Sequence, residues 1–311
     1  MKVEIPEDLK ADLPQTTFGK ILSATPVVMA VVATMLAGLA SSEMTRAQYE
    51  RSLGAQQQAK AGDQWSFFQA KRLRGALQNN SVDLLENVIE IRPLDLAALR
   101  SALAGSEAGK ALESEDGKRV LEALRKGEAP PAPLKGDLDP KIKAALHGYE
   151  ITVPDAEMAR LLADVTDDAL ENELKTAREL TQSYDSTTKP LNTLLDQVDT
   201  ALSSGGKADK TVKQAFSMAR LRYNSSRYEV EARLNQAIAN FYELQVRKSN
   251  ISAVRHHLRS QWFFFGMLGA QAGVIISTFA MAARKKNLLW SLAAGAGIIA
   301  VAFAIYVYLY M

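Results

Sequence analysis

Apolar residues are concentrated in three segments of the chain. Residues 21–41 contain no charged side chain, and two further charge-free segments, 262–283 and 288–311, are separated only by residues 284–287. A helix needs about 20 mostly apolar residues to cross the hydrocarbon core of a bilayer. The pattern therefore predicts three transmembrane helices, the last two of which form a hairpin, after an N-terminal tail of residues 1–20.

The first apolar segment has an alternative interpretation as a secretory signal, because Gly38 and Ala40 form a small-x-small cleavage pattern. Against this, its apolar run is longer than the roughly 7 to 15 residues of a signal core, and acidic residues precede it. We expect an uncleaved anchor. Starting the helix at Pro26 would leave too few residues to cross, so we expect a start near Thr17 and a kink at Pro26.

Basic residues stand beside the apolar segments. The short turn 284–287 contains Arg284, Lys285 and Lys286, which by the positive-inside rule predicts a cytoplasmic turn, a cytoplasmic N-terminus and an external segment between the first and second spans. Arg255 and Arg259 stand on the opposite side and favour the reverse orientation. We expect all five cations to face lipid headgroups.

Polar side chains are rare within the predicted spans. No span contains Asp, Glu, Lys, Arg or His, so the proton relays typical of many pumps have no candidate residues. Gln271 is the one strongly polar side chain, and Gly269 and Gly273 form a Gly-x-x-x-Gly pair around it. Because small residues let helices approach closely, we interpret these three residues as a helix-packing site.

The region between the first two spans has the composition of long helices. From residue 209 to 260 there is no proline or glycine, and one heptad position is apolar throughout, at Phe216, Tyr223, Val230, Ala237, Leu244, Ile251 and Leu258. Residues 42–91 form a second arm of nearly equal length. We therefore predict an all-α membrane protein with a long antiparallel helical stalk, coiled-coil-like in character, made of residues 42–91 and 209–260.

Residues 92–208 are predicted to form a small helical head with a proline-rich linker at 127–133. Pro154 is expected to open a helix that runs to about residue 180, and Pro190 a shorter one. Residues 150–153 are the only strand-like stretch. In the first arm, the pair Asn79 and Asn80 is expected to break the helix.

The most distinctive stretch of the chain is an aromatic and polar run in the first arm. On a helix its rings would cover a face too wide for one partner helix, and they would lie too far from the bilayer for an interfacial belt. We expect them to pack on the apolar patch at the same height of the second arm. The predicted interaction residues are Asp63, Gln64, Trp65, Phe67, Phe68, Lys71, Leu234 and Phe241.

This run resembles the bacterial domain-of-unknown-function 4337 family, whose members carry Asp-Gln-Trp, an aromatic pair and Gln-Ala-Lys after an N-terminal span. The basic turn at Arg284 between two terminal spans is a further likeness. The sequence departs from the family in Ser66, Phe67 and Phe68, where Ala-Tyr-Tyr is expected, and in a larger middle region. The resemblance implies a multi-pass protein of the bacterial inner membrane and no particular reaction.

Composition gives little support to an enzyme. The chain has no cysteine and only three histidines, which excludes disulfides, thiolate zinc sites and thiol nucleophiles. Lys plus Arg total 37 against 35 for Asp plus Glu, so there is no general attraction to nucleic acid. The adjacent pair His256 and His257 is poorly spaced for shared metal ligation on a helix. We predict no catalytic, cofactor or metal site.

The sequence therefore predicts a non-enzymatic membrane-anchored helical scaffold or assembly subunit, acting through self-association or partner binding. Its expected partners are membrane lipids and further copies or subunits of a larger membrane complex. The alternative is a subunit of an oligomeric pore or transporter, for which Gln271, Ser277 and Thr278 are the available polar lining.

Overall fold

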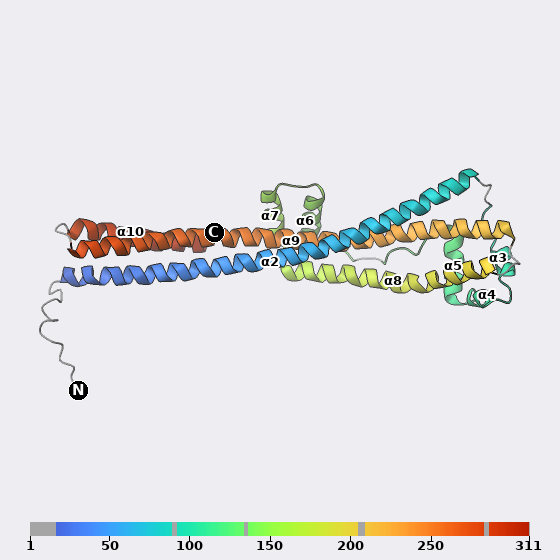
Figure 1. Ribbon diagram of the computed structural model, residues 1–311, viewed down its shortest axis with the longest axis horizontal. Helices are drawn as coiled ribbons and strands as arrows, with labels where there is room; N and C mark the ends of the chain where they lie inside the picture. Colours follow the sequence, from blue (N-terminus) through green and yellow to red (C-terminus); the bar gives the residue numbers. More distant parts are fainter. Residues whose placement is uncertain (1–16, 89–91, 134–135, 205–208, 283–285, 311) are drawn as a thin grey trace, which may run out of the picture. The chain divides into compact units, whose positions relative to one another are not determined.

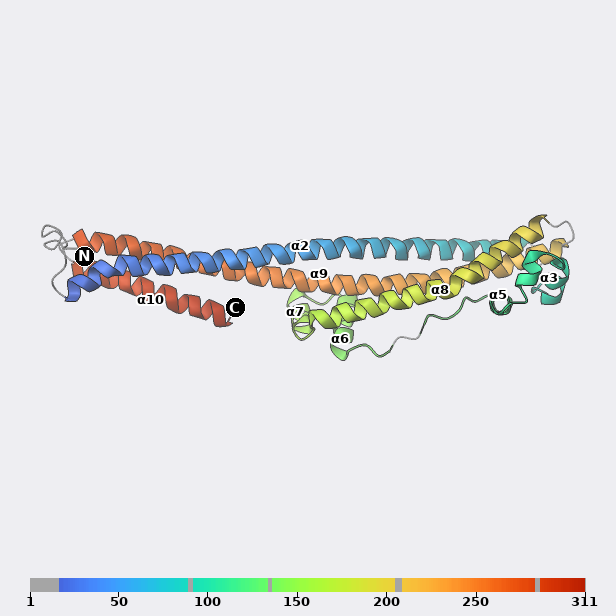
Figure 2. The same cartoon turned by 90° about the horizontal axis from the view of Figure 1, so that it is seen from below.

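The computed structural model describes residues 17–88, 92–133, 136–204, 209–282 and 286–310 (Figure 1). Within these ranges the chain is helical almost throughout and contains no strand, so the predicted all-α class is confirmed. Figure 2 shows the same helices from a perpendicular direction. The helices are α2 (Thr17–Val88), α3 (Leu96–Ala102), α4 (Glu107–Ala111), α5 (Glu115–Lys126), α6 (Pro140–Glu150), α7 (Asp155–Ala163), α8 (Asp167–Ser204), α9 (Lys210–Ala282) and α10 (Lys286–Tyr310).

Side-chain caps define where several of the short helices begin. Asp95 accepts hydrogen bonds from backbone N–H groups at the start of α3, and Ser106, Ser114 and Asp139 do the same for α4, α5 and α6. Such caps satisfy backbone donors that have no partner inside the helix. Helix α5 ends at Gly127, whose φ of 68° lies in the left-handed region that glycine adopts without strain.

The chain divides into two compact units, to both of which α2 and α9 contribute. Unit 1 comprises residues 1–54 and 249–311, and unit 2 comprises residues 55–248. Helices α2, α9 and α10 are each long and apolar enough to cross a membrane. This agrees with the three predicted apolar spans as far as length and composition decide it.

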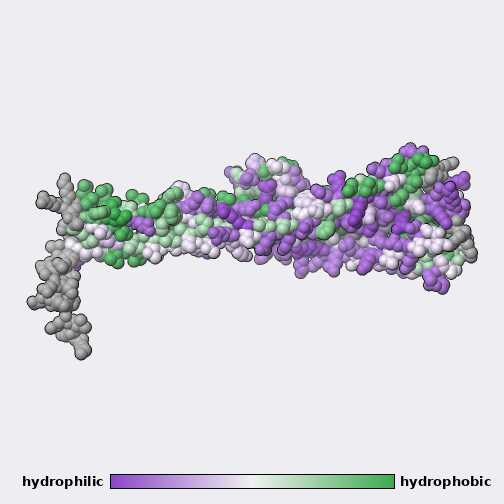
Figure 3. Space-filling model, in the orientation of Figure 1, coloured by the Kyte–Doolittle hydropathy of each residue, from purple (hydrophilic) through white to green (hydrophobic). Residues whose placement is uncertain are grey.

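In unit 1 the apolar parts of the three long helices pack on one another. Trp290 Nε1 of α10 donates a hydrogen bond to Thr25 Oγ1 of α2 at 2.8 Å, and Ser260 Oγ of α9 donates to the Ala40 carbonyl at 2.7 Å. Figure 3 shows hydrophobic side chains over the surface of α10 and the beginning of α2. The buried core residues are Met29, Ala33, Leu36, Ala40, Phe263, Ala270, Ala300 and Val307.

In unit 2 the main core lies between the short helices α3 to α5 and the long helices α8 and α9. Its largest members include Leu99, Leu121, Leu195, Phe216 and Tyr223. Burying a side chain of this size is worth about 1.5 to 3 kcal/mol, and this offsets the entropy of ordering the connecting loops.

Several local sequence predictions were wrong. Pro190 lies inside α8 and does not open a helix, because buried side chains on either side of it, Tyr184 before and Leu191 after, hold α8 together at the cost of one backbone hydrogen bond. The helix after Pro154 ends at Ala163, and α8 starts separately because the Thr166 hydroxyl caps it by accepting from the Ala169 N–H at 3.2 Å. Of the strand-like residues 150–153, Glu150 ends α6 and residues 151–152 form the turn that follows it. Helix α2 already includes Thr17, the first described residue, so it does not start at Pro26, and it continues unbroken through Asn79 and Asn80.

Candidate functional site

The aromatic and polar run of α2 lies against α9 in unit 2. Trp65 Nε1 donates a hydrogen bond to Glu243 Oε1 at 3.3 Å, and Lys71 Nζ forms an ion pair with Glu231. One turn further along α2, the Gly75 carbonyl accepts from the Ser225 hydroxyl at 3.2 Å. Residue numbers in α2 rise as those in α9 fall, so the two helices run in opposite directions in this unit.

The predicted aromatic residues do not all share one environment. Trp65 and Phe68 are partly buried and make an edge-to-face contact with ring centroids 5.4 Å apart, whereas Phe67 is 54 % exposed. On α9, Phe241 is buried and Leu234 is partly buried. The packing surface of α2 is therefore narrower than the sequence suggested, because Phe67 points away from it.

The polar members of the run also differ. Asp63 is exposed, and Gln64 is partly buried with its Oε1 atom lacking a hydrogen-bond partner among the described residues. Lys71 is held by Glu231, which is only 6 % exposed. Of these three residues, Lys71 alone makes an ion pair across the interface between α2 and α9.

Glu231 is the polar centre of unit 2 and was missed by the sequence analysis. One carboxylate oxygen meets Lys71 Nζ, and Arg227 Nη1 lies 3.3 Å from the other. A buried carboxylate is stable only where cations and donors replace its water, and here two cations do so. Arg227 lies one turn before Glu231 on α9, and this ion pair accounts for its partly buried position.

Tyrosines of α8 and α9 lie in the electric field of this carboxylate. Burial raises the pKa of Tyr223 to about 12, and its hydroxyl donates to Asn192 Oδ1 at 3.0 Å. Burial also raises the pKa of Tyr184, whose hydroxyl has no hydrogen-bond partner among the described residues. Burial, followed by repulsion from Glu231, raises the pKa of Asp185. Burial thus favours the neutral form of both tyrosines near Glu231.

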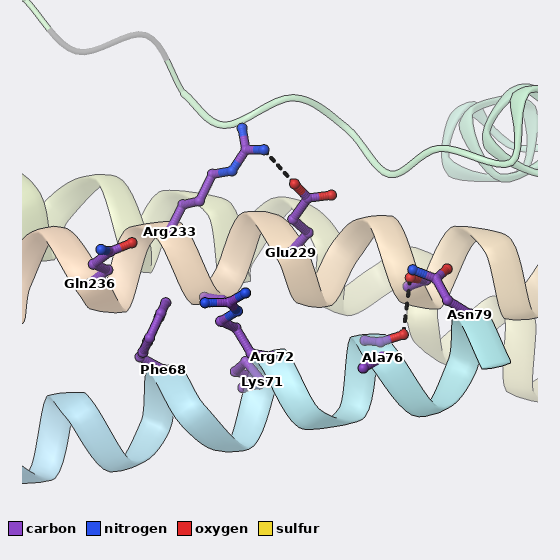
Figure 4. A pocket seen from close by; sticks show the side chains of 11 residues that line it. Phe68, Lys71, Arg72, Ala76, Asn79, Glu229, Arg233 and Gln236 are labelled. Carbon is purple, nitrogen blue, oxygen red and sulfur yellow. Dashed lines mark hydrogen bonds and ion pairs between the residues drawn. The ribbon is translucent and has the colours of Figure 1, made fainter.

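A cavity of about 410 Å³ opens beside the motif, between α2 and α9 (Figure 4). Its polar lining comes from both helices and includes three cationic side chains, one carboxylate and two amides. These residues are Lys71, Arg72 and Asn79 of α2 and Glu229, Arg233 and Gln236 of α9.

Within unit 1, the predicted packing residues of α9 lie in different surroundings. Gly273 lies against Met29, whose Cε would be 2.3 Å from a β-carbon at that position, whereas a β-carbon at Gly269 would meet nothing within 4 Å. Gln271 is exposed and Ser277 is buried. Close helix approach therefore occurs at Gly273 but not at its predicted companion Gly269.

The predicted basic residues are placed only in part. Arg255 is exposed, and Arg259 is partly buried with its Nε lacking a partner among the described residues. Arg284 and Lys285 lie outside the described residues, and Lys286 is the first residue of α10. The structure adds a contact that the sequence did not indicate, because His256 Nδ1 lies 2.6 Å from Glu43 Oε2.

The described residues contain no group of three or more His, Cys, Asp or Glu side chains that could hold a metal ion. The arrangement around the motif is that of a helix interface with one adjoining cavity.

Comparison with known families gives one match. Residues 18–126 match the model of DUF4337, a domain of unknown function. The resemblance predicted from the aromatic run is thereby confirmed. No curated protein and no solved structure matches the chain.

The DUF4337 segment covers nearly all of α2 and continues to the end of α5. It contains Trp65 and Lys71 but neither of their partners, Glu243 and Glu231, which lie on α9. The terminal hairpin, a further ground for the resemblance, also lies beyond the DUF4337 match. The DUF4337 motif in this chain therefore serves, at least in part, to bind α2 to a helix outside the matched segment.

Proposed function

We propose that this chain is a non-enzymatic, membrane-anchored helical scaffold that acts through self-association or by holding a partner subunit. In this proposal the apolar segments of α2, α9 and α10 span a bacterial inner membrane, and the remaining parts of α2 and α9 form an antiparallel stalk. The length and composition of the three helices support the anchor. The opposed contacts of α2 and α9 in unit 2 support the stalk.

The observation that carries the proposal is an exposed apolar row on α2 outside its membrane-length apolar segment. Leu73, Leu77, Leu84 and Val88 are 54 to 78 % exposed. Their spacing of four, seven and four residues places them on one face of the helix. Exposed apolar side chains gathered on one face of a helix are typical of sites that bind another protein.

The test is the mass and composition of the full chain after gentle extraction from its native membrane. We expect a homo-oligomer or a fixed-ratio complex, and we expect the double variant Leu77→Glu, Leu84→Glu to reduce the assembly. Asn79→Glu, an exposed position on the opposite side of α2 from this row, is the matched control. A monomeric wild-type chain without a second protein, or an assembly unaffected by the double variant, would contradict the proposal.

The alternative function, a pore or transporter subunit, has one favourable observation. Gln271 and Thr278 are both exposed on α9, seven residues apart and thus on one face of an apolar segment. Several copies could line a path with these side chains. A flux across liposomes that Gln271→Leu abolishes would favour the pore, whereas a scaffold tolerates this change.

We also propose that the N-terminus and the 284–287 turn are cytoplasmic and that unit 2 is external. The basic turn supports this orientation. Since the chain has no cysteine, single cysteines at Asn287 and Asp137 report the orientation through a membrane-impermeant maleimide. Labelling of Asp137→Cys but not of Asn287→Cys from outside intact cells is the expected result, and the reverse pattern inverts the topology.

A further inference from the structure

The cavity beside the motif has an excess of positive charge. Its lining contains three cationic side chains, Lys71, Arg72 and Arg233, against one carboxylate, Glu229, so its formal charge is +2. The volume of about 410 Å³ lies within the range of about 300 to 1,000 Å³ that is usual for small-molecule sites. The cavity is thus large enough for a small anion with an organic body.

The three cations are not equally available to a ligand. Lys71 shares the Glu231 carboxylate with Arg227, and Arg233 pairs with Glu229 on its own helix. Counting Glu231 and Arg227 with the lining leaves the local formal charge at +2. Arg72 forms no ion pair with any carboxylate in the described parts of the chain, and its guanidinium carbon lies 5.6 Å from the centre of the Phe68 ring. Stacking on an aromatic ring orients an arginine while leaving its N–H donors free.

Arg72 is directed into the cavity. Figure 4 shows its guanidinium extending from α2 toward α9 beside the Phe68 ring, with Asn79 and Gln236 further along the cavity in opposite directions. The two amides supply neutral donors and acceptors, and the Phe68 ring supplies an apolar wall. The lining therefore combines an oriented, unpaired cation, uncharged polar groups and an aromatic surface.

We propose that this cavity binds a small phosphomonoester with an apolar or aromatic body, its phosphate held by Arg72. A phosphomonoester carries a charge of about −1.5 to −2 at neutral pH, which matches the +2 of the lining better than the single charge of a carboxylate does. The planar guanidinium can bind two phosphate oxygens at once. This site is independent of the scaffold proposal, because it requires neither assembly nor the exposed leucine row.

The test is calorimetric titration of the detergent-solubilised full chain with phenyl phosphate. We expect saturable binding that Arg72→Gln weakens by at least about tenfold, equivalent to about 1.4 kcal/mol. Arg74→Gln is the matched control, since Arg74 is an exposed arginine of α2 that does not line the cavity, and it should change the Kd by less than about twofold. Arg72→Lys, which keeps the charge and loses the fork, should fall between wild type and Arg72→Gln.

Two results would overturn the proposal. One is the absence of saturable binding to the wild-type chain up to about 10 mM phenyl phosphate, a concentration that reveals even a Kd of about 1 mM. The other is an equal loss of affinity in Arg72→Gln and Arg74→Gln, which would indicate general charge attraction. Both arginines are exposed, so helicity by circular dichroism should be unchanged and should exclude misfolding as the cause.

Discussion

Replacing Glu231 by glutamine should destabilise unit 2 more than any other single charge removal on α9. The variant leaves Lys71 and Arg227 charged in places where their side chains are only 27 % and 16 % exposed. Removing one partner of a fully buried ion pair costs about 3 to 5 kcal/mol. Because both cations keep some access to water, we expect the lower end of that range, about 3 kcal/mol.

A double-mutant cycle measures the energy of the Lys71–Glu231 ion pair separately from the effect of burying either side chain. Lys71→Met alone leaves Glu231 paired with Arg227 and should cost about 1 to 2 kcal/mol. Combining it with Glu231→Gln should cost about 1 to 2 kcal/mol less than the sum of the two single changes. The assay is denaturant unfolding of the full chain in detergent, followed by circular dichroism.

Glu229→Gln is the control for this experiment. Glu229 lies two residues before Glu231 on α9 and pairs with the exposed Arg233, and such surface pairs contribute about 0 to 1 kcal/mol. If Glu231→Gln costs no more than Glu229→Gln, or if the cycle shows no coupling, then the buried ion pair does not hold α2 to α9.

Three further experiments test the packing of both units and the burial of Tyr223. Phe68→Ala should lower the free energy of unfolding by about 2 kcal/mol, less than the ~3 to 5 kcal/mol of a fully buried aromatic, and Phe67→Ala should lower it by less than about 1 kcal/mol. Equal losses in the two variants would contradict the assignment of the packed face. Gly273→Leu should lower the thermal stability by about 1 to 3 kcal/mol because it displaces Met29, while Gly269→Leu should be tolerated, and the reverse order would be inconsistent with the packing of unit 1. Above pH 10 an unfolded chain loses the Tyr223 proton that the folded chain retains to about pH 12, so the free energy of unfolding should fall as the pH rises from 10. In urea unfolding, Tyr223→Phe should make this fall less steep. An unchanged dependence on pH would refute the raised pKa.

The sequence predicted those features that depend on local pattern. Composition and periodicity account for the apolar runs of membrane length, for a helix that includes residues before Pro26, and for the helical character of both arms. Pro190 was misjudged because proline weakens an isolated helix, whereas packing of the neighbouring leucines decides the outcome here.

The candidate site was predicted in outline but not in its partners. The aromatic run identified Trp65, Phe68 and Lys71, yet the carboxylates that bind Trp65 and Lys71 lie about 160 to 180 positions later in the chain. No local pattern pairs residues across such a separation, because the register between two long helices is set by packing along their whole contact. The direction of Phe67, one position from Phe68, was likewise decided by that register.

The boundary of the DUF4337 match has a practical meaning for dissecting this protein. A fragment of residues 18–126 would carry Lys71 and Trp65 without the carboxylates that receive their hydrogen bonds, and it would expose the side of α2 that α9 covers. Such a fragment should aggregate or remain poorly ordered when produced alone, and should regain solubility when residues 209–282 are supplied with it. The segment that matches the family is therefore shorter than the part of the chain that we expect to fold independently.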